Sequence, residues 1–281
     1  MRIQLNTCRA LVIMIAAVLL FSARPGFTQS FIDRDSSHVV PRVYASIGGY
    51  FPTITTSLRV DSDFGLGTDI SLEDDLKMPA IMSVFKADVF YRVKNRSQFA
   101  LSFTSMRRDK NVKIDKDISF ADTTFSIDSE VTAWFNTNYY GLTWRYSVWN
   151  KPGWQAGFSV GLRALQIDAG IKARLNDKNY EKSSAIIAPA LLVGIHGSGY
   201  ITDRFLARYS MEYFQLSVEG IKIVVLENKF SLDYYIIRNL GIGVGYSTSV
   251  YNVKEIPFDS DFKGRVRFGF AGFQAQLSAR F

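Results

Sequence analysis

The chain has 281 residues, of which 47% are hydrophobic, 14% aromatic and 21% charged. This composition is too apolar for a disordered protein, and the mean hydropathy of +0.03 is too low for a bundle of transmembrane helices. The formal net charge is +7. Lysine and arginine are spread through the chain without one basic stretch, which argues against a nucleic-acid partner.

Cysteine and histidine are too scarce for most metal chemistry. The only cysteine is Cys8 and the only histidines are His38 and His196. A disulfide framework and a thiolate zinc site are therefore excluded, and we expect neither a metal nor another cofactor.

The N-terminus has the pattern of an export signal. Arginines precede an apolar run over residues 10–21, which is too short to span a membrane as a helix. We predict a signal peptide over 1–23, with cleavage there or as late as residue 29, then a linker over 24–38 and one domain over 39–281. An uncleaved anchor is the alternative.

The rest of the chain is dominated by two-residue alternation of apolar and polar side chains, which is typical of strands with two different faces. The last segment shows it clearly, with apolar side chains at every odd position from Ala271 to Phe281. We predict ten strands, with eight to twelve as the range, at 39–59, 80–93, 97–110, 127–148, 153–172, 184–200, 205–219, 222–237, 240–254 and 264–281.

The connections between these strands alternate in length. Short turns are expected near residues 94–97, 150–153, 201–204 and 238–239, and longer loops over 60–79, 111–126, 173–183 and 255–263. An even number of strands with short turns at one rim and long loops at the other is typical of an outer-membrane β-barrel, with the short turns in the periplasm. The fold class is therefore an all-β, single, up-and-down antiparallel transmembrane barrel.

Aromatic residues gather beside the short turns, as expected of a girdle at the membrane interface. The predicted girdle comprises Tyr91, Phe99, Trp149, Trp154, Tyr200, Phe205, Tyr234, Tyr235 and Phe281. A soluble exported β-sandwich or binding barrel is the alternative, with the apolar face turned inward.

The final strand, FQAQLSARF, resembles the C-terminal signal of Gram-negative outer-membrane barrels, which ends in a phenylalanine. The segments TTSLRVDSDFGLGTDISLEDDLKM and FKADVFYR look like a group of largely uncharacterised exported barrels, with a general resemblance to small barrels of the OmpA and OmpW type. The resemblance implies that Phe281 is an assembly signal. It also implies partners during biogenesis, namely the barrel-assembly machinery and periplasmic chaperones, and it supplies no catalytic residues.

Three further features are candidate sites. His196 and Ser198 have the spacing of the histidine and serine in outer-membrane lipid A deacylases, but they point into the lumen without an evident acid, so we expect a hydrogen-bonding pair and no catalytic residues. The acidic loop over 60–79 is expected to be solvated, and the basic loop over 172–182 either binds lipopolysaccharide phosphates or is merely soluble.

Reading the polar face inward predicts a narrow or closed lumen crossed by ion pairs. Its charged residues are Arg42, Lys86, Asp88, Arg92, Arg108, Arg145, Arg163, Arg208, Glu212, Glu227, Lys229, Asp233 and Arg280. The predicted function is a non-enzymatic, monomeric surface or structural barrel in contact with outer-membrane lipid and lipopolysaccharide, with weak solute permeability or binding through its loops. The alternatives are a lipid-modifying hydrolase of the outer membrane and a soluble exported binding barrel.

Overall fold

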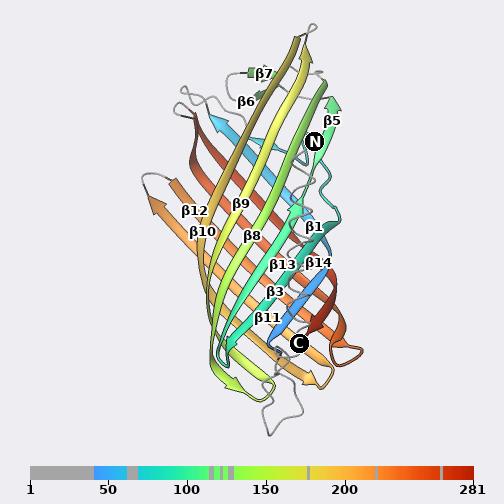
Figure 1. Cartoon of the computed structure of the whole chain (residues 1–281). Helices are drawn as coiled ribbons and strands as arrows, with labels where there is room; N and C mark the ends of the chain where they lie inside the picture. The colour runs from blue at the N-terminus through green and yellow to red at the C-terminus, as the bar shows by residue number, and fades with distance from the viewer. Residues whose placement is uncertain are drawn as a thin grey trace.

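The computed structural model describes residues 41–61, 69–113, 117–120, 123–125, 130–175, 178–218, 221–259 and 262–281. It is an all-β barrel whose strands run antiparallel, each beside its neighbour along the chain (Figure 1). The predicted signal peptide and linker lie outside the described residues. No helix in the described part of the chain is long and apolar enough to cross a membrane.

Ten strand positions form the wall, and strand β14 pairs with β1 to close it. The wall strands are β1 (Val43–Asp61), β3 (Val84–Lys94), β4 (Ser97–Met106) with its continuation β5 (Asp109–Lys113), β8 (Glu130–Lys151), β9 (Trp154–Leu175), β10 (Lys178–Thr202), β11 (Phe205–Val218), β12 (Ile221–Tyr235), β13 (Leu240–Asp259) and β14 (Phe262–Arg280). The predicted fold class and strand number are confirmed.

Three short strands lie apart from this order. Strand β2 (Ile70–Ser71) pairs with β1, whereas β6 (Ile118–Phe120) and β7 (Thr123–Phe125) pair only with each other. The two ends of the barrel also differ (Figure 1). We call the end with the tight β3–β4, β8–β9, β10–β11 and β12–β13 connections the short-turn end, and the opposite end the long-hairpin end.

Two predicted loops are largely strand. Strands β9 and β10 continue through most of 173–183, and β13 and β14 continue through most of 255–263. The prediction stopped these strands too early because the alternation of apolar residues fades beyond Ile171 and Val253, while backbone pairing continues from Lys178↔Leu175 and Asp259↔Phe262.

The apolar residues change face along several strands. In β14, Val266, Phe268 and Phe270 are buried inside, whereas Phe273 and Leu277, of opposite parity, are 70% and 62% exposed on the outside. In β9, likewise, Leu165 and Ile167 are buried while Leu162 and Phe158 are exposed. The short-turn half is thus apolar outside and polar inside, and the long-hairpin half is the reverse.

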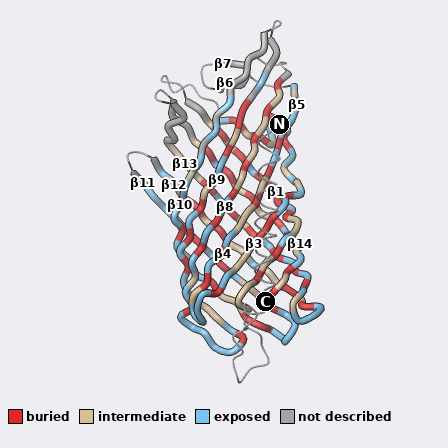
Figure 2. Tube along the Cα trace, viewed as in Figure 1, coloured by how far each residue is buried: buried red, intermediate tan, exposed pale blue. Residues whose placement is uncertain are grey.

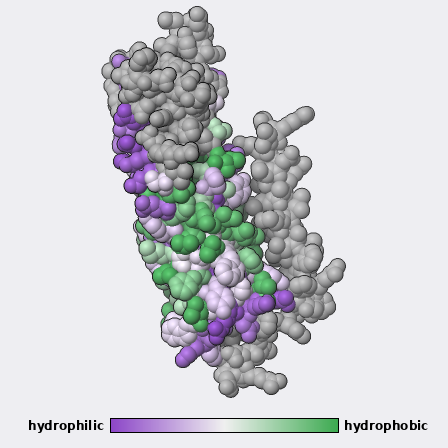
Figure 3. Space-filling view, turned by 90° about the vertical axis from the view of Figure 1, so that its left-hand side faces the viewer, coloured by the Kyte–Doolittle hydropathy of each residue, from purple (hydrophilic) through white to green (hydrophobic). Residues whose placement is uncertain are grey.

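The outward apolar residues of the short-turn half form a continuous band. Figure 3 shows this band over one face, with hydrophilic residues gathered below it at the short-turn end. Along the strands, buried and exposed residues alternate (Figure 2). A band of this kind around a closed sheet is what a lipid-facing barrel wall requires.

The predicted aromatic girdle is correct for most of its members and wrong for two. Tyr91, Phe99, Trp149, Trp154 and Phe205 are exposed. Tyr200 and Tyr235 are instead buried with Leu206 in a small cluster at the short-turn end. Both side chains have the parity of the inward face of their strands. Closeness to a turn in the sequence does not reveal this parity where the pairing register shifts at the turn, as it does between Tyr200 and Thr202.

Closure between β1 and β14 depends on glycine. A Cβ at Gly48 would lie 2.0 Å from the Ala275 carbonyl oxygen of β14, whereas a Cβ at Gly269, in the same strand pair, would meet nothing nearer than 3.9 Å. We expect Gly48→Ala to lower the free energy of unfolding by about 1–3 kcal/mol, since neighbouring backbone must shift. The measurement is urea unfolding in detergent or vesicles.

Gly269→Ala is the matched control, with an expected effect within about 1 kcal/mol of the parent. Equal midpoints for the two variants would contradict close packing at the β1–β14 seam as the reason for Gly48.

Candidate functional site: the barrel interior

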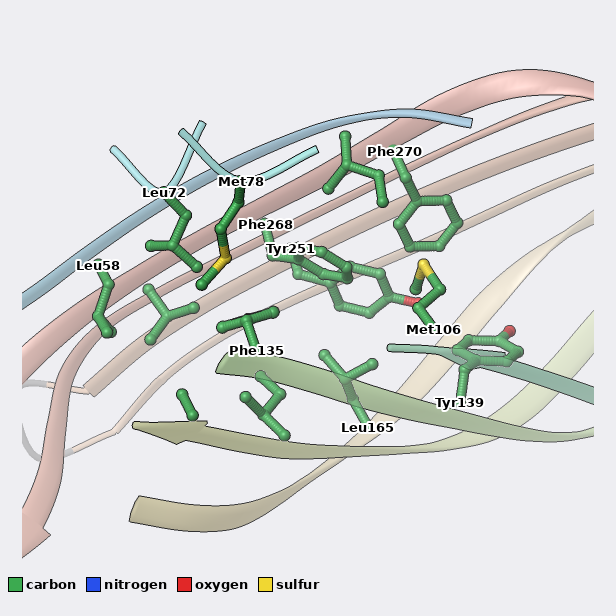
Figure 4. Close-up of a cluster of buried hydrophobic side chains, with 14 of the residues drawn as sticks. Leu58, Leu72, Met78, Met106, Phe135, Tyr139, Leu165, Tyr251, Phe268 and Phe270 are labelled. Carbon is green, nitrogen blue, oxygen red and sulfur yellow. The ribbon is translucent and has the colours of Figure 1, made fainter. Parts of the chain in front are cut away.

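The interior of the barrel consists of two layers that follow from the exchange of faces. The short-turn half holds charged and polar side chains, which we call the charged layer. The long-hairpin half holds a cluster of buried apolar side chains, which we call the apolar core, including Met106, Phe135, Leu165 and Phe268 (Figure 4). The charged lumen residues expected from the sequence thus lie mainly in the short-turn half, and the apolar core of the long-hairpin half was not expected.

Arg163 is central to the charged layer. Glu212 and Glu227 lie directly opposite each other on β11 and β12, and the Arg163 guanidinium pairs with both of them. Two carboxylates in register repel each other, and the arginine from β9 offsets that repulsion. Arg163 and Glu227 are both almost fully buried, so this is an interior ion-pair cluster.

Glu227 has further partners. Its carboxylate accepts hydrogen bonds from the hydroxyls of Tyr139 at 3.0 Å and Tyr251 at 2.5 Å, and Lys229 Nζ lies 3.4 Å away. The two tyrosines belong to the apolar core. Glu227 therefore joins the two layers of the interior.

A second cluster involves Arg208 and Asp233. Arg208 pairs with Asp233, and the Tyr44 hydroxyl lies within hydrogen-bond distance of both. Gln276 donates to Asp233 at 2.9 Å. Nearby, Lys86 donates to Gln274 at 2.6 Å and lies 3.8 Å from Asp88.

The remaining predicted lumen residues bind neutral groups. Arg92 donates to the Asn95 carbonyl at 2.9 Å and to Gln155 at 3.1 Å, and Arg145 lies over the Phe90 ring. Arg42 is at the rim, where it donates to Tyr91 on the outer surface. Within the described residues no carboxylate pairs with Arg92 or Arg145, so the charged layer carries an excess of positive charge.

Arg280 lies at the short-turn end. Its guanidinium donates to Tyr200 at 2.6 Å and lies 3.6 Å from the centre of the Tyr235 ring. Its Nε also donates to the Arg238 carbonyl at 2.7 Å. At the chain end, the backbone of Phe281 pairs with that of Val43, which holds the last residue against β1.

His196 and Ser198 do not bond each other, contrary to the prediction. His196 Nε2 lies 3.4 Å from Ser147 Oγ, and Ser198 Oγ accepts from Gln155 at 2.8 Å. The small cavity beside them, about 70 Å³, is lined by Arg42, Arg92, Arg145, Lys151 and Arg208 and by no described carboxylate. The orienting acid of a hydrolytic triad has no counterpart among the described residues here.

The segment after β1 was predicted to be a solvated acidic loop, and this is wrong for its second half. Residues 70–78 turn into the long-hairpin end, where Ile70, Leu72, Leu76 and Met78 are buried in the apolar core (Figure 4). We call 70–78 the plug. Asp69 and Asp74 are exposed, as predicted. The side chain of Asp61 and the whole of Asp63 are not among the described parts of the structure.

One buried ion pair fastens the plug to the wall. Arg108, at the break between β4 and β5, is 1% exposed and pairs with Glu73. It also donates to Thr56 Oγ1 at 2.5 Å, and the Thr56 N–H donates to Glu73 at 2.7 Å. The Ile54 N–H donates to the Ala80 carbonyl at 2.7 Å, so both ends of the plug are tied to β1.

Sequence reasoning missed the plug, and it also missed the apolar core, for which a signal was present. In β14 the apolar residues occupy even positions up to Phe270 and odd positions from Ala271 onward. Such a change of parity within one strand marks the level at which the lipid-facing surface ends. The basic side chains of 172–182 lie mostly outside the described residues, and within that range Lys172 is exposed.

Among solved structures, the chain is similar to the outer-membrane protease OmpT of Escherichia coli, with 12% identity, a TM-score of 0.52, and coverage of 85% of this chain and 96% of that one. The Pseudomonas putida toluene transporter TodX matches with 9% identity, a TM-score of 0.32 and coverage of 85% and 90%. No family model and no curated protein matches. The likeness to OmpT shows that the fold is that of an outer-membrane barrel.

Removing Arg163 should expose the cost of the two facing carboxylates. We expect Arg163→Met to reduce the free energy of unfolding by about 3–5 kcal/mol, since buried charge is left uncompensated. Urea unfolding followed by tryptophan fluorescence measures this.

The triple variant Arg163→Met, Glu212→Gln, Glu227→Gln should recover a large part of that loss, because the repulsion is gone. If the triple variant were less stable than Arg163→Met alone, the assignment of Arg163 as the neutralising group would be wrong.

Proposed function

We propose that the protein is an integral outer-membrane barrel with a closed lumen, acting as a non-enzymatic surface protein. Its short-turn end faces the periplasm and its long hairpins project from the cell. The observation that carries the proposal is the plug, which fills the mouth of the barrel with buried apolar side chains and is fastened by the Arg108–Glu73 pair. The apolar outer band supports the membrane location.

Two filled layers in series leave no wide pore, and of these the plug with the apolar core is the one that seals the lumen. The plug and apolar core occupy the long-hairpin half, and the charged layer with the Arg280 cluster occupies the short-turn half. Small barrels are largely filled by their own side chains, whereas barrels of about 16 strands leave a channel. The long hairpins are then the surface available to a partner outside the cell.

A hydrolase is the second candidate function, favoured only by the likeness of fold to a protease. That likeness is at 12% identity and carries no residues across. Mass spectrometry of lipid A, with and without expression of the protein, tests the lipid-modifying version of this candidate; altered lipid A would contradict a non-enzymatic role.

Single-channel recording in planar bilayers tests the closed lumen. We expect the parent protein to give no discrete conductance steps. Replacing residues 70–78 by a glycine–serine segment of equal length should produce steps, because the apolar core loses the side chains that cap it. The double variant Asp74→Ser, Lys77→Ser changes exposed plug residues and should remain silent.

The open variant should prefer anions. Arg92, Arg145 and Arg280 lack a carboxylate partner among the described residues, so the charged layer attracts negative ions. Reversal potentials in a salt gradient measure this preference. Conductance of the parent protein equal to that of the plug replacement would contradict the closed lumen, and cation preference would contradict the charge assignment.

A further inference from the structure

Among the described residues, the wall of the barrel is incomplete between β10 and β11. Their pairing runs from the short-turn end up to Val193↔Tyr213 and stops there. Strand β10 continues to Lys178 and β11 to Val218, but these parts pair only with β9 and β12, respectively. The two strands diverge toward the long-hairpin end (Figure 1), and we call this gap the seam.

Pro189 lies on the open edge of β10. Successive residues of a strand send their N–H groups to opposite neighbours. The Tyr200 N–H donates to the Gly153 carbonyl on the β9 side, and the β9–β10 register continues from there to Pro189 without a shift. Pro189 is an odd number of residues from Tyr200, so its backbone nitrogen points to the opposite side, toward β11. The position that lacks an N–H therefore faces the seam, where a pairing strand would need a donor.

Side chains at the seam are exposed although they are apolar. Leu216 has the inward parity of Glu212 and Phe214, yet it is 42% exposed; it pairs with Ile223 of β12, and no described strand pairs with it on the β10 side. On β10, Ile187 points outward and is 68% exposed. Its pairing partner on β9 is Gln166, and the outward residues of β9 at this level, Gln166 and Asp168, are polar. Both edges of the seam are thus apolar, beside a stretch of β9 that is polar on the outside.

A cavity of about 360 Å³ lies beside the β10 edge of the seam. Its lining combines the edge residues Ile187 and Pro189 of β10 with inward residues of β9, β12, β13 and β14, among them Leu165, Val225, Tyr251 and Phe268. Arg163 at its base is already paired with two carboxylates. Ligand sites for small molecules have volumes of roughly 300–1,000 Å³ and mostly apolar walls.

The geometry points to a binding site for a single alkyl chain that enters the apolar core sideways through the seam between β10 and β11. The opening lies at the upper edge of the lipid-facing band, where hydrocarbon chains of the surrounding membrane are available. Because the cavity walls carry no uncompensated charge, they favour the apolar chain of an amphiphile, whose polar head would stay outside at the edges of the seam. The chain is that of a membrane lipid or of a free fatty acid.

Photo-crosslinking distinguishes this site from ordinary lipid contact. The protein is placed in phospholipid vesicles with one of two probes, a phosphatidylethanolamine or a free fatty acid, each with a diazirine near the end of its chain. After irradiation, labelled residues are mapped by mass spectrometry. Outward residues such as Leu162 should be labelled in every case, whereas Leu165, Tyr251 and Phe268 are reachable only from inside.

We expect labelling of the inward residues by at least one probe. Inward labelling by the phospholipid assigns the site to membrane lipid, and inward labelling by the fatty acid alone assigns it to a free amphiphile. Labelling confined to outward residues with both probes would overturn the proposal.

A pair of variants adds a second test. Ala190 is 8% exposed and lines the cavity, so Ala190→Phe should fill it and reduce inward labelling at least tenfold while outward labelling persists. Leu191→Phe, one residue away on the outer face, should leave inward labelling unchanged. Equal inward labelling in the two variants would contradict entry into this cavity. Because the readout is labelling and not conductance, its failure is separate from failure of the closed-lumen proposal.

Discussion

Pairing of the backbone governs the whole structure, since a sheet that crosses lipid must leave no polar edge. Closure of β14 on β1 meets this requirement, and the alternation of side chains then decides what each surface exposes. The exchange of the apolar face within single strands, visible between Phe270 and Phe273, limits the lipid-facing surface to the short-turn half. Beyond that level the barrel has the polarity of a water-soluble one.

The two interior layers are consequences of that exchange. Below it the inward residues are polar, and buried charge is tolerated only when paired, as Arg163 is with Glu212 and Glu227. Above it the inward residues are apolar, and an open mouth would leave them in water. The plug removes this cost by burying Leu72, Leu76 and Met78 against them, and the Arg108–Glu73 pair fixes its position.

The sequence predicts the wall well and the interior only in part. Strands such as 205–219 and 153–172 are found within a few residues because alternation is a local property. The prediction places Tyr200 and Tyr235 in the outer girdle because they lie near turns. Which face they occupy depends on the register of the strands at the turn, which strand pairing sets and the local sequence does not reveal. The plug could not be foreseen for a different reason: burial of Leu72 depends on wall residues far away in the sequence, and its acidic neighbours made 60–79 look solvated.

Unequal strand length explains why the wall is not sealed everywhere. Strand β10 has 25 residues and its neighbour β11 only 14, so their pairing cannot extend to the tip of β10. Yet pairing ends at Val193↔Tyr213, while β11 still continues to Val218, so length alone is not sufficient. Pro189 adds a local reason, because a partner strand would find no donor there. The same apolar core that closes the barrel along its axis is thereby left accessible from the side, at a level where lipid chains and the core meet.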